Sequence, residues 1–575
     1  MLGLLLWASG DAAAHPSWGA CKELEPYLAA GAEALGESDA QGSDAFVLYK
    51  RVVSTSARGG APELAARLAG MRTGFPAPAA EADLASCLLR NYVVVQYGDE
   101  MVRDLREMVA FRTFAVEGQE NWNAPEFVRQ REWLEGRARA LGFFFKSYEG
   151  RVEEITLEGP TLEGLTTPVL ALLTHGDVQD VRNQTWTSPP WEGRLVGRKI
   201  VGRGTEDDKG PIVASLYAMA ALRDSAWSRT STVRLLVANG EESSWEEIPY
   251  YLARAPMPDV TVGLDAAYPI VHAQKGYGIV SLKAKPAAEP RPGKWRVTKM
   301  SGGSGLSIIP ERGEALLERL GEKKERNGAR KELTRLAKEW SAAHPPAKLT
   351  VSQEGSLLKV TTVGRSGHSS IPEKGHNALG DLTAFLATLD PVQDARGALA
   401  TFVGLALGTE TNGNALGIAH RDPGMGDLTV SLAFLAEEEG DPVARINLRV
   451  PRGITRDEIA RRIDERAAAF EKRAGAGIAA EVTLPSEAHF VEPEGPLVST
   501  LLGVWQEVTG QPGKPVAIGG GTQARLFKGA VDFGPAESME VYRGHGPDEH
   551  LTVDELNRVA QLTVTALWRL AGATK

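Results

Sequence analysis

The spacing of apolar residues divides the chain into segments of different character. From about residue 16 to residue 98, apolar side chains recur at helical spacing, as Leu64, Leu68 and Met71 do. From about residue 99, short apolar runs alternate with helical stretches, and the run at residues 167–175 ends at His175. This alternation predicts a largely parallel sheet that is covered by helices on both faces.

Between residues 281 and 485 the pattern becomes mixed. Residues 357–365, 426–438 and 444–451 alternate polar and apolar positions, which predicts antiparallel strands. The charged stretch 311–340 predicts a pair of solvated helices, and an α/β pattern returns after residue 486. We therefore predict an α/β fold with a split catalytic domain (99–280 and 486–575) built on a mixed, mostly parallel sheet covered by helices. An inserted α+β lid domain (281–485) and an N-terminal helical extension (16–98) complete it.

The first 15 residues resemble a signal peptide that has lost its positively charged start. Residues 2–8 are mostly apolar, and the alanines at 12–14 form a small-residue cleavage site. An ordinary frayed terminus is the alternative, and export to the periplasm or the medium is favoured over the cytoplasm. No other run reaches the length of a membrane span.

Composition narrows the function classes further. The 575 residues exceed the size of one ordinary domain, and the net charge of −10 gives no electrostatic footprint for nucleic acid or an anionic membrane. There are two cysteines, Cys21 and Cys87, with no CxxC pair, so a cysteine zinc site is excluded. A disulfide in an exported protein and two inert buried thiols both remain open for them.

Acidic and imidazole groups follow three of the expected strands. Gly176 and Asp177 come after His175, Glu241 and Glu242 follow the next apolar run, and Asp265 follows another. In open α/β sheets, ligands bind beyond the carboxyl ends of the strands, so these groups are expected to share one crevice. Each motif alone is also typical of a buried, hydrogen-bonded histidine or a solvated loop.

A second acidic pair, Asp207 and Asp208, precedes an expected helix. Several carboxylates in one crevice repel each other unless a cation is present. Mixed histidine and carboxylate ligands suit zinc, with cobalt or manganese as alternatives. The pattern therefore predicts two divalent cations that share one carboxylate, an arrangement that recurs in hydrolases.

Five motifs, in this order, resemble those of the di-zinc aminoacylase/carboxypeptidase/dipeptidase metallopeptidase family. They are HGD at 175–177, GRGTEDDKGP at 202–211, GEE at 240–242, DAAYP at 265–269 and HGPDE at 545–549. The similarity is greatest to peptidase V-like dipeptidases. It includes GGGTQAR at 519–525 and extends from about residue 99 to the C-terminus.

The resemblance implies a set of metal ligands for two Zn²⁺ ions. His175, Asp207 and Asp265 would hold one ion. Asp207, Glu242 and His545 would hold the other, with Asp207 bridging. The peptide bond after Asp207 is typically cis in this family.

The resemblance also implies roles for the groups around the metals. Glu241 would be the general base that takes a proton from the attacking water and passes it to the leaving amine. Asp177 would accept a hydrogen bond from His175 and fix its tautomer. His368, in the lid, would donate to the tetrahedral oxyanion, and Arg525 would pair with the free carboxylate of the substrate.

The sequence departs from the family pattern at two positions. Ser307 stands where relatives usually have asparagine, and Ala267 stands where an acidic residue is common. We predict a dipeptidase that acts on small peptides, with a monomer favoured over a homodimer. An N-acyl-amino-acid amidohydrolase or carboxypeptidase is the alternative enzyme, and an inactive metal-binding interaction protein is the alternative that is not an enzyme.

Overall fold

The computed structural model describes residues 16–116, 118–160, 167–182, 184–285 and 289–572. The first 15 residues, to which the signal-peptide prediction applies, lie outside this part of the chain. Two compact units are present. Unit 1 comprises Met1–His272, Val491–Val516 and Thr522–Lys575, and unit 2 comprises Ala273–Phe490 and Ala517–Gly521.

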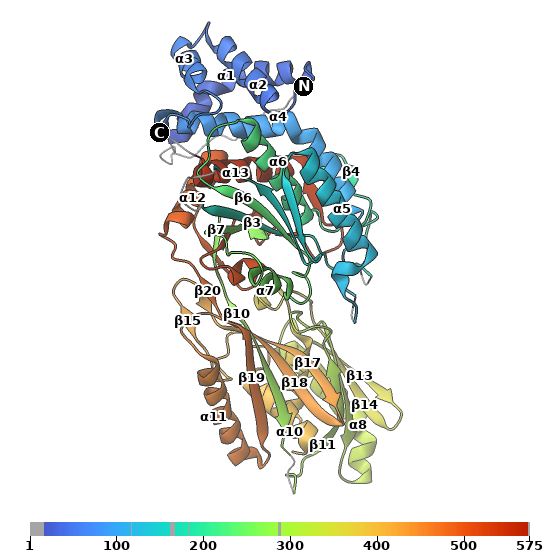
Figure 1. Ribbon diagram of the computed structural model, residues 1–575. Coiled ribbons are helices and arrows are strands. Elements are labelled where there is room, and N and C mark those ends of the chain that lie inside the picture. Colours follow the sequence, from blue (N-terminus) through green and yellow to red (C-terminus); the bar gives the residue numbers. More distant parts are fainter. Residues whose placement is uncertain (1–15, 117, 161–166, 183, 286–288, 573–575) are drawn as a thin grey trace. The chain divides into compact units, whose positions relative to one another are not determined.

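The N-terminal extension is helical and shares a core with the rest of unit 1. Helix α4 lies beside α6 and α13, and α1 and α2 pack on it (Figure 1). The aromatic rings of Phe46, Tyr92 and Trp227 meet edge to face in this core. The helices are α1 (Pro16–Gly36), α2 (Gly42–Ala57), α3 (Pro62–Gly70), η1 (Ala79–Glu81) and α4 (Ala82–Val109).

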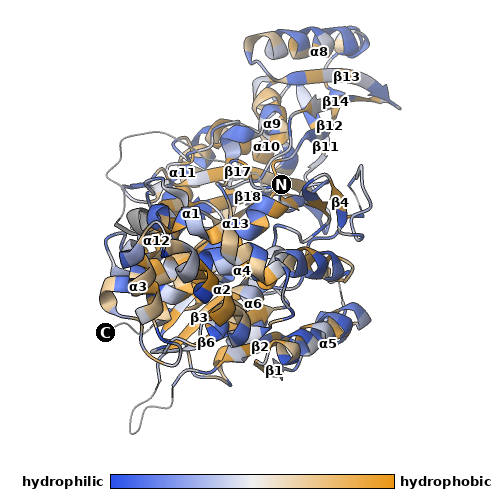
Figure 2. Ribbon diagram, turned by 90° about the horizontal axis from the view of Figure 1, so that it is seen from above, coloured by the Kyte–Doolittle hydropathy of each residue, from blue (hydrophilic) through white to orange (hydrophobic). Residues whose placement is uncertain are grey.

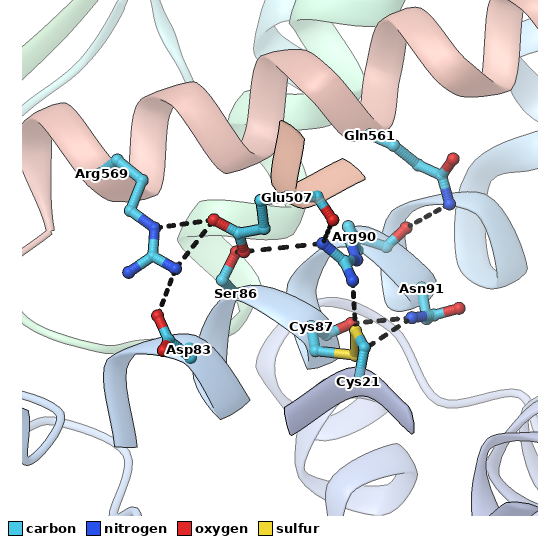
Figure 3. The surroundings of a disulfide bond; sticks show 9 residues. All are labelled: Cys21, Asp83, Ser86, Cys87, Arg90, Asn91, Glu507, Gln561 and Arg569. Carbon is cyan, nitrogen blue, oxygen red and sulfur yellow. Dashed lines mark hydrogen bonds and ion pairs between the residues drawn. A yellow bond between two sulfur atoms is a disulfide. The ribbon is translucent and has the colours of Figure 1, made fainter. Parts of the chain in front are cut away.

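A disulfide between Cys21 and Cys87 links α1 to α4 within the extension (Figure 3). Beside it, Arg90 of α4 contacts the Cys21 sulfur and lies 3.5 Å from the Glu507 carboxylate. Glu507 also pairs with Arg569 at 2.8 Å. The extension is therefore joined to the C-terminal part of unit 1 by buried charges as well as by apolar packing.

The main sheet of unit 1 is mixed, with order β1-β2-β6-β3-β7-β22-β9. Strand β3 pairs in parallel with β6 and β7, whereas β1 and β2 are antiparallel additions at one edge. Its strands are β1 (Phe144–Tyr148), β2 (Val152–Leu157), β3 (Val169–His175), β6 (Thr232–Ala238), β7 (Val260–Gly263), β9 (Val271–Gln274) and β22 (Val531–Asp532).

The central strand is buried on both faces, as its continuous apolar sequence predicts. Leu170 and Leu172 of β3 belong to the core shared with α6 and α13, whereas Ala171 and Leu173 belong to a second core with α7 and η4. The mixed α/β fold class predicted from the sequence is thus confirmed. The remaining helices of unit 1 are η2 (Asn121–Asn123), α5 (Pro125–Ala140), α6 (Lys209–Asp224), α7 (Glu247–Leu252), α12 (Pro496–Thr509), η4 (Gln523–Leu526) and α13 (Val553–Ala571).

Among the described residues, two small sheets lie outside the main sheet of unit 1. Strands β24 and β4 flank β5, and β23 pairs in parallel with β8. Their bounds are β4 (Arg194–Val196), β5 (Lys199–Val201), β8 (Ala266–Ala267), β23 (Pro535–Ala536) and β24 (His550–Thr552).

Unit 2 is built on an antiparallel sheet of order β13-β14-β12-β11-β17-β18-β10-β19. Alternate residues of β18, such as Ala444, Ile446 and Leu448, enter its core together with helices α9 and α10. The strands are β10 (Gly276–Ala284), β11 (Trp295–Gly302), β12 (Arg312–Arg319), β13 (Lys348–Glu354), β14 (Leu357–Val363), β17 (Thr429–Glu438), β18 (Asp441–Val450) and β19 (Ile478–Ser486).

The prediction of two helices in the charged stretch 311–340 is wrong in its first half. Residues Arg312–Arg319 form β12, because Gly313, Ala315 and Leu317 alternate into the core while charged residues face outward. The second half forms α8, along which polar and apolar residues alternate (Figure 2). The other elements are α8 (Lys323–Ala343), η3 (Pro372–Lys374), α9 (Ala378–Thr388), α10 (Ala395–Ala406), β15 (Arg421–Asp422), β16 (Gly426–Asp427), α11 (Arg456–Ala474), β20 (His489–Phe490) and β21 (Val516–Ile518).

Within the described residues, no helix is both long enough and apolar enough to cross a bilayer.

Candidate metal centre

Three parallel strands of unit 1 end in the residues singled out from the sequence. His175 is the last residue of β3, Glu241 and Glu242 follow β6, and Asp265 follows β7. Because β3 lies between β6 and β7 and runs parallel to both, these ends lie at one edge of the sheet.

Two loops bring further groups to this edge. Asp207 lies between β5 and α6, and the Asp207–Asp208 peptide bond is cis, as the resemblance implies. His545 lies between β23 and β24, has a positive φ of 65° and a side chain that is 46% exposed.

The donor atoms form two overlapping groups that share Asp207. His175 Nε2 lies 2.8 Å from Asp207 Oδ1 and 3.4 Å from Asp265 Oδ1. His545 Nε2 lies 3.0 Å from Asp207 Oδ2 and 3.0 Å from Glu242 Oε1. Within each group the donor atoms lie within 4.8 Å of one another. The members of the two groups are those of the implied ligand sets, and imidazole with carboxylate donors fits a pair of divalent cations.

Burial and neighbouring charges shift the pKa values of the carboxyl groups in this cluster strongly. Burial raises the pKa of Asp265 to about 6, even though His175 acts in the opposite direction. Removal from solvent also raises the pKa of Glu241 well above its usual range, and the Asp265 carboxylate adds to this. For Asp207, the two imidazoles outweigh burial and hold the pKa of the carboxyl well below its usual value. Positive charge is therefore favourable between these side chains, which is the condition a bound cation satisfies.

Asp177 supports the loop that carries the two glutamates. Its carboxylate accepts hydrogen bonds from the backbone N–H groups of Glu241 at 3.1 Å and Glu242 at 2.9 Å. The nearest acceptor for His175 Nδ1 is the Asp177 backbone carbonyl at 2.9 Å, with the carboxylate at 3.6 Å. The structure thus differs from the expectation in detail, because a carbonyl faces the ring nitrogen and the carboxylate instead orients Glu241 and Glu242.

The two residues expected to contact the substrate lie in different units. His368 belongs to unit 2, where its Nδ1 lies 2.6 Å from the hydroxyl of Ser370. Arg525 belongs to unit 1 and lies on η4. Thr522 precedes this turn, and its side chain accepts a hydrogen bond from Ala524 N. Gln523 of the same turn bonds to Glu247 of α7, which fixes the turn to the element after the glutamates.

Three polar side chains that the sequence patterns did not indicate contact residues singled out from the sequence. The hydroxyl of Tyr542 lies 2.5 Å from Asp207 Oδ2, and Gln179 donates to Glu242 Oε2 at 2.6 Å. In unit 2, Arg449 is buried, contacts Ser307 and Asn447, and has no carboxylate partner among the described residues. Tyrosine and glutamine in loops carry no spacing signal. Arg449 stands at a polar position of the alternating strand, so its burial could not be predicted from the sequence pattern.

Comparisons with known proteins identify relatives of this chain. The sequence model of Peptidase family M20/M25/M40 matches residues 171–569 of this chain. The chain is 26% identical over 485 residues to a beta-Ala-Xaa dipeptidase of Lactobacillus delbrueckii subsp. lactis, covering 82% of this chain and 96% of that one. It is 30% identical over 405 residues to YtjP of Bacillus subtilis, which carries the name of a dipeptidase, covering 70% and 83%.

Solved structures are similar at lower identity. Human carnosine dipeptidase 1 aligns with a TM-score of 0.49 and 14% identity, over 86% of this chain and 99% of that one. The di-peptidase Dug1p of Saccharomyces cerevisiae aligns with a TM-score of 0.48 and 11% identity, over 85% and 98%.

Proposed function

Because the chain belongs to Peptidase family M20/M25/M40, an enzyme family of peptidases and dipeptidases, we propose that it hydrolyses dipeptides or other short peptides. The proposed reaction uses two zinc ions, with Glu241 as general base. The observation that supports this most directly is the sharing of Asp207 by two donor groups, with Glu241 beside them. Glu241 lines a small cavity together with His175, Asp265 and Gln523.

Two ions held by these groups would polarise a peptide carbonyl and lower the pKa of a water molecule toward neutrality. The residues of the chain supply the rest of the chemistry. Glu241 is proposed to take the proton of the attacking water and to deliver it to the leaving amine. Asp177 keeps Glu241 in place through its backbone N–H.

Substrate recognition is proposed to use cationic side chains for the free carboxylate. Arg525 on η4 offers a guanidinium fork that suits a carboxylate. Arg449 is a second candidate, because it is buried and none of the carboxylates among the described residues pairs with it. His368 is proposed to donate to the oxyanion of the tetrahedral intermediate. We also propose that the protein acts as a monomer.

The test is a panel of Xaa-Xaa dipeptides and N-acetyl amino acids, assayed with zinc, cobalt and manganese after removal of metal. The proposal expects dipeptide hydrolysis that is lost with the metal and restored by one of the three ions. Glu241→Gln is expected to lower kcat by about 10²- to 10⁴-fold while metal binding is retained. Glu246→Gln is the matched control, because Glu246 lies in the same loop and is exposed.

Hydrolysis of N-acyl amino acids is the second candidate function. It would use the same donor groups and differ in not reading a free amino group. The observation that favours it is Ala267, a buried residue of β8 that offers no charge to a substrate amine. If N-acetyl amino acids are cleaved faster than every dipeptide, this second function replaces the first.

A further inference from the structure

Arg203 and Glu549 form an ion pair in the interior of unit 1, next to the candidate metal centre. Their side chains are 1% and 0% exposed, and Arg203 Nη1 lies 2.7 Å from Glu549 Oε2. Arg203 comes four residues before Asp207, and Glu549 comes four residues after His545. The pair therefore joins the two loops that carry these donors.

The Glu549 carboxylate shapes the loop that leads to Asp207. Its Oε1 accepts hydrogen bonds from the backbone N–H groups of Glu206 at 2.9 Å and Asp207 at 3.2 Å. Its Oε2 accepts from Gly204 N at 3.1 Å as well as from Arg203. The backbone of the loop thus wraps around one carboxylate, which sets the position from which the Asp207 side chain extends.

The other end of the pair holds His545. Arg203 Nη2 donates to the His545 carbonyl at 3.2 Å and to Gln184 Oε1 at 2.7 Å, and Gln184 Nε2 donates to the same carbonyl at 2.6 Å. His545 has a positive φ, a conformation that a non-glycine residue keeps only when its surroundings impose it. Two donors on its carbonyl provide that constraint.

We propose that Arg203, Glu549 and Gln184 are positioning residues that hold Asp207 and His545 in place for metal binding. This inference rests on the proposed metal-dependent function. A fully buried ion pair contributes little net stability compared with apolar packing, so its presence at this junction is explained by the geometry it imposes. Residues that orient metal ligands typically change metal affinity by about 10- to 100-fold when they are altered.

Zinc titration of metal-free protein against a chelating dye, which gives two binding constants, tests the proposal. Glu549→Gln is expected to weaken both ions by about 10- to 100-fold, because Asp207 belongs to both donor groups. Gln184→Ala is expected to weaken one ion only, because His545 belongs to one group. Arg198→Ala removes an ion pair to Asp554 with side chains 64% and 63% exposed, and it should leave both constants unchanged.

Circular dichroism and thermal unfolding of each metal-free variant show whether it folds. If Glu549→Gln does not fold, Gln184→Ala decides alone, since this side chain is only half-buried. Wild-type constants in a folded Gln184→Ala or Glu549→Gln variant would overturn the positioning role. A wild-type protein that binds no zinc would overturn the proposed function instead, so the two failures are distinguishable.

Discussion

Replacing both cysteines, as Cys21→Ala together with Cys87→Ala, should destabilise unit 1 without altering its chemistry. The disulfide joins residues that are 66 positions apart. In the chain-entropy description, opening a loop of this length costs about 4 kcal/mol of stability at 25 °C, because the unfolded chain gains conformational freedom. The metal donors all follow this segment in the sequence, so peptidase activity of the folded variant should match that of the wild type.

Urea unfolding followed by tryptophan fluorescence measures the effect, since the chain has 12 tryptophans. A loss of about 4 kcal/mol shifts the midpoint to lower urea with little change in slope. The matched control is reductant: it should destabilise the wild type to the level of the double variant and leave the variant itself unchanged. A shift of less than about 1 kcal/mol, or a variant that still responds to reductant, would refute the reasoning.

Three further predictions concern the buried charges and the metals. Glu507→Gln leaves the guanidinium of Arg90 buried without a carboxylate and should cost about 3–5 kcal/mol in urea unfolding, whereas Glu465→Gln, which breaks an exposed pair, should cost less than about 1 kcal/mol. Burial raises the pKa of Glu153 from 4.5 to about 7, so the folded protein loses stability as the pH rises from 4.5 through 7. Glu153→Gln should remove this loss, and the variant should be more stable than the wild type at pH 8 by roughly 3 kcal/mol. Equal pH profiles of stability for the two proteins would count against the assignment. Zinc at 100 times the dissociation constant of each site should stabilise the metal-free protein by about 2.7 kcal/mol for each ion bound in thermal unfolding, and an unchanged Tm would contradict metal binding to the folded state.

The residues at the carboxyl ends of the strands could be predicted from the sequence, because their position depends only on the strand that precedes them. A parallel strand delivers the residue that follows it to one edge of the sheet, so His175, Glu242 and Asp265 could be placed together without knowledge of loop paths. The contacts between Arg203 and Glu549 could not be predicted in this way. Those residues are 346 positions apart, and two irregular loops decide whether they meet.

The misassigned strand β12 has a different cause. Leu316 and Leu317 are adjacent and lie between charged residues, so the segment satisfies a helical spacing as well as an alternating one. Pairing with β11 and β14 on both sides decides for the strand, and this long-range pairing is invisible in a local window. Short apolar runs are therefore where sequence patterns are least informative about the strands of unit 2.

Hydrogen bonds also separate metal ligands from supporting carboxylates, a distinction that residue type alone does not give. Asp177 uses both carboxylate oxygens on backbone N–H groups, and Glu549 does the same with an arginine in addition, so both carboxylates are engaged in holding the loops. Asp208 accepts from the backbone N–H of His175, and burial raises the pKa of its carboxyl well above the usual value. Asp207 alone of the adjacent pair places one oxygen against His175 and the other against His545. These contacts support the proposal of Asp207, and not Asp208, as the shared donor, which the sequence supports only through resemblance.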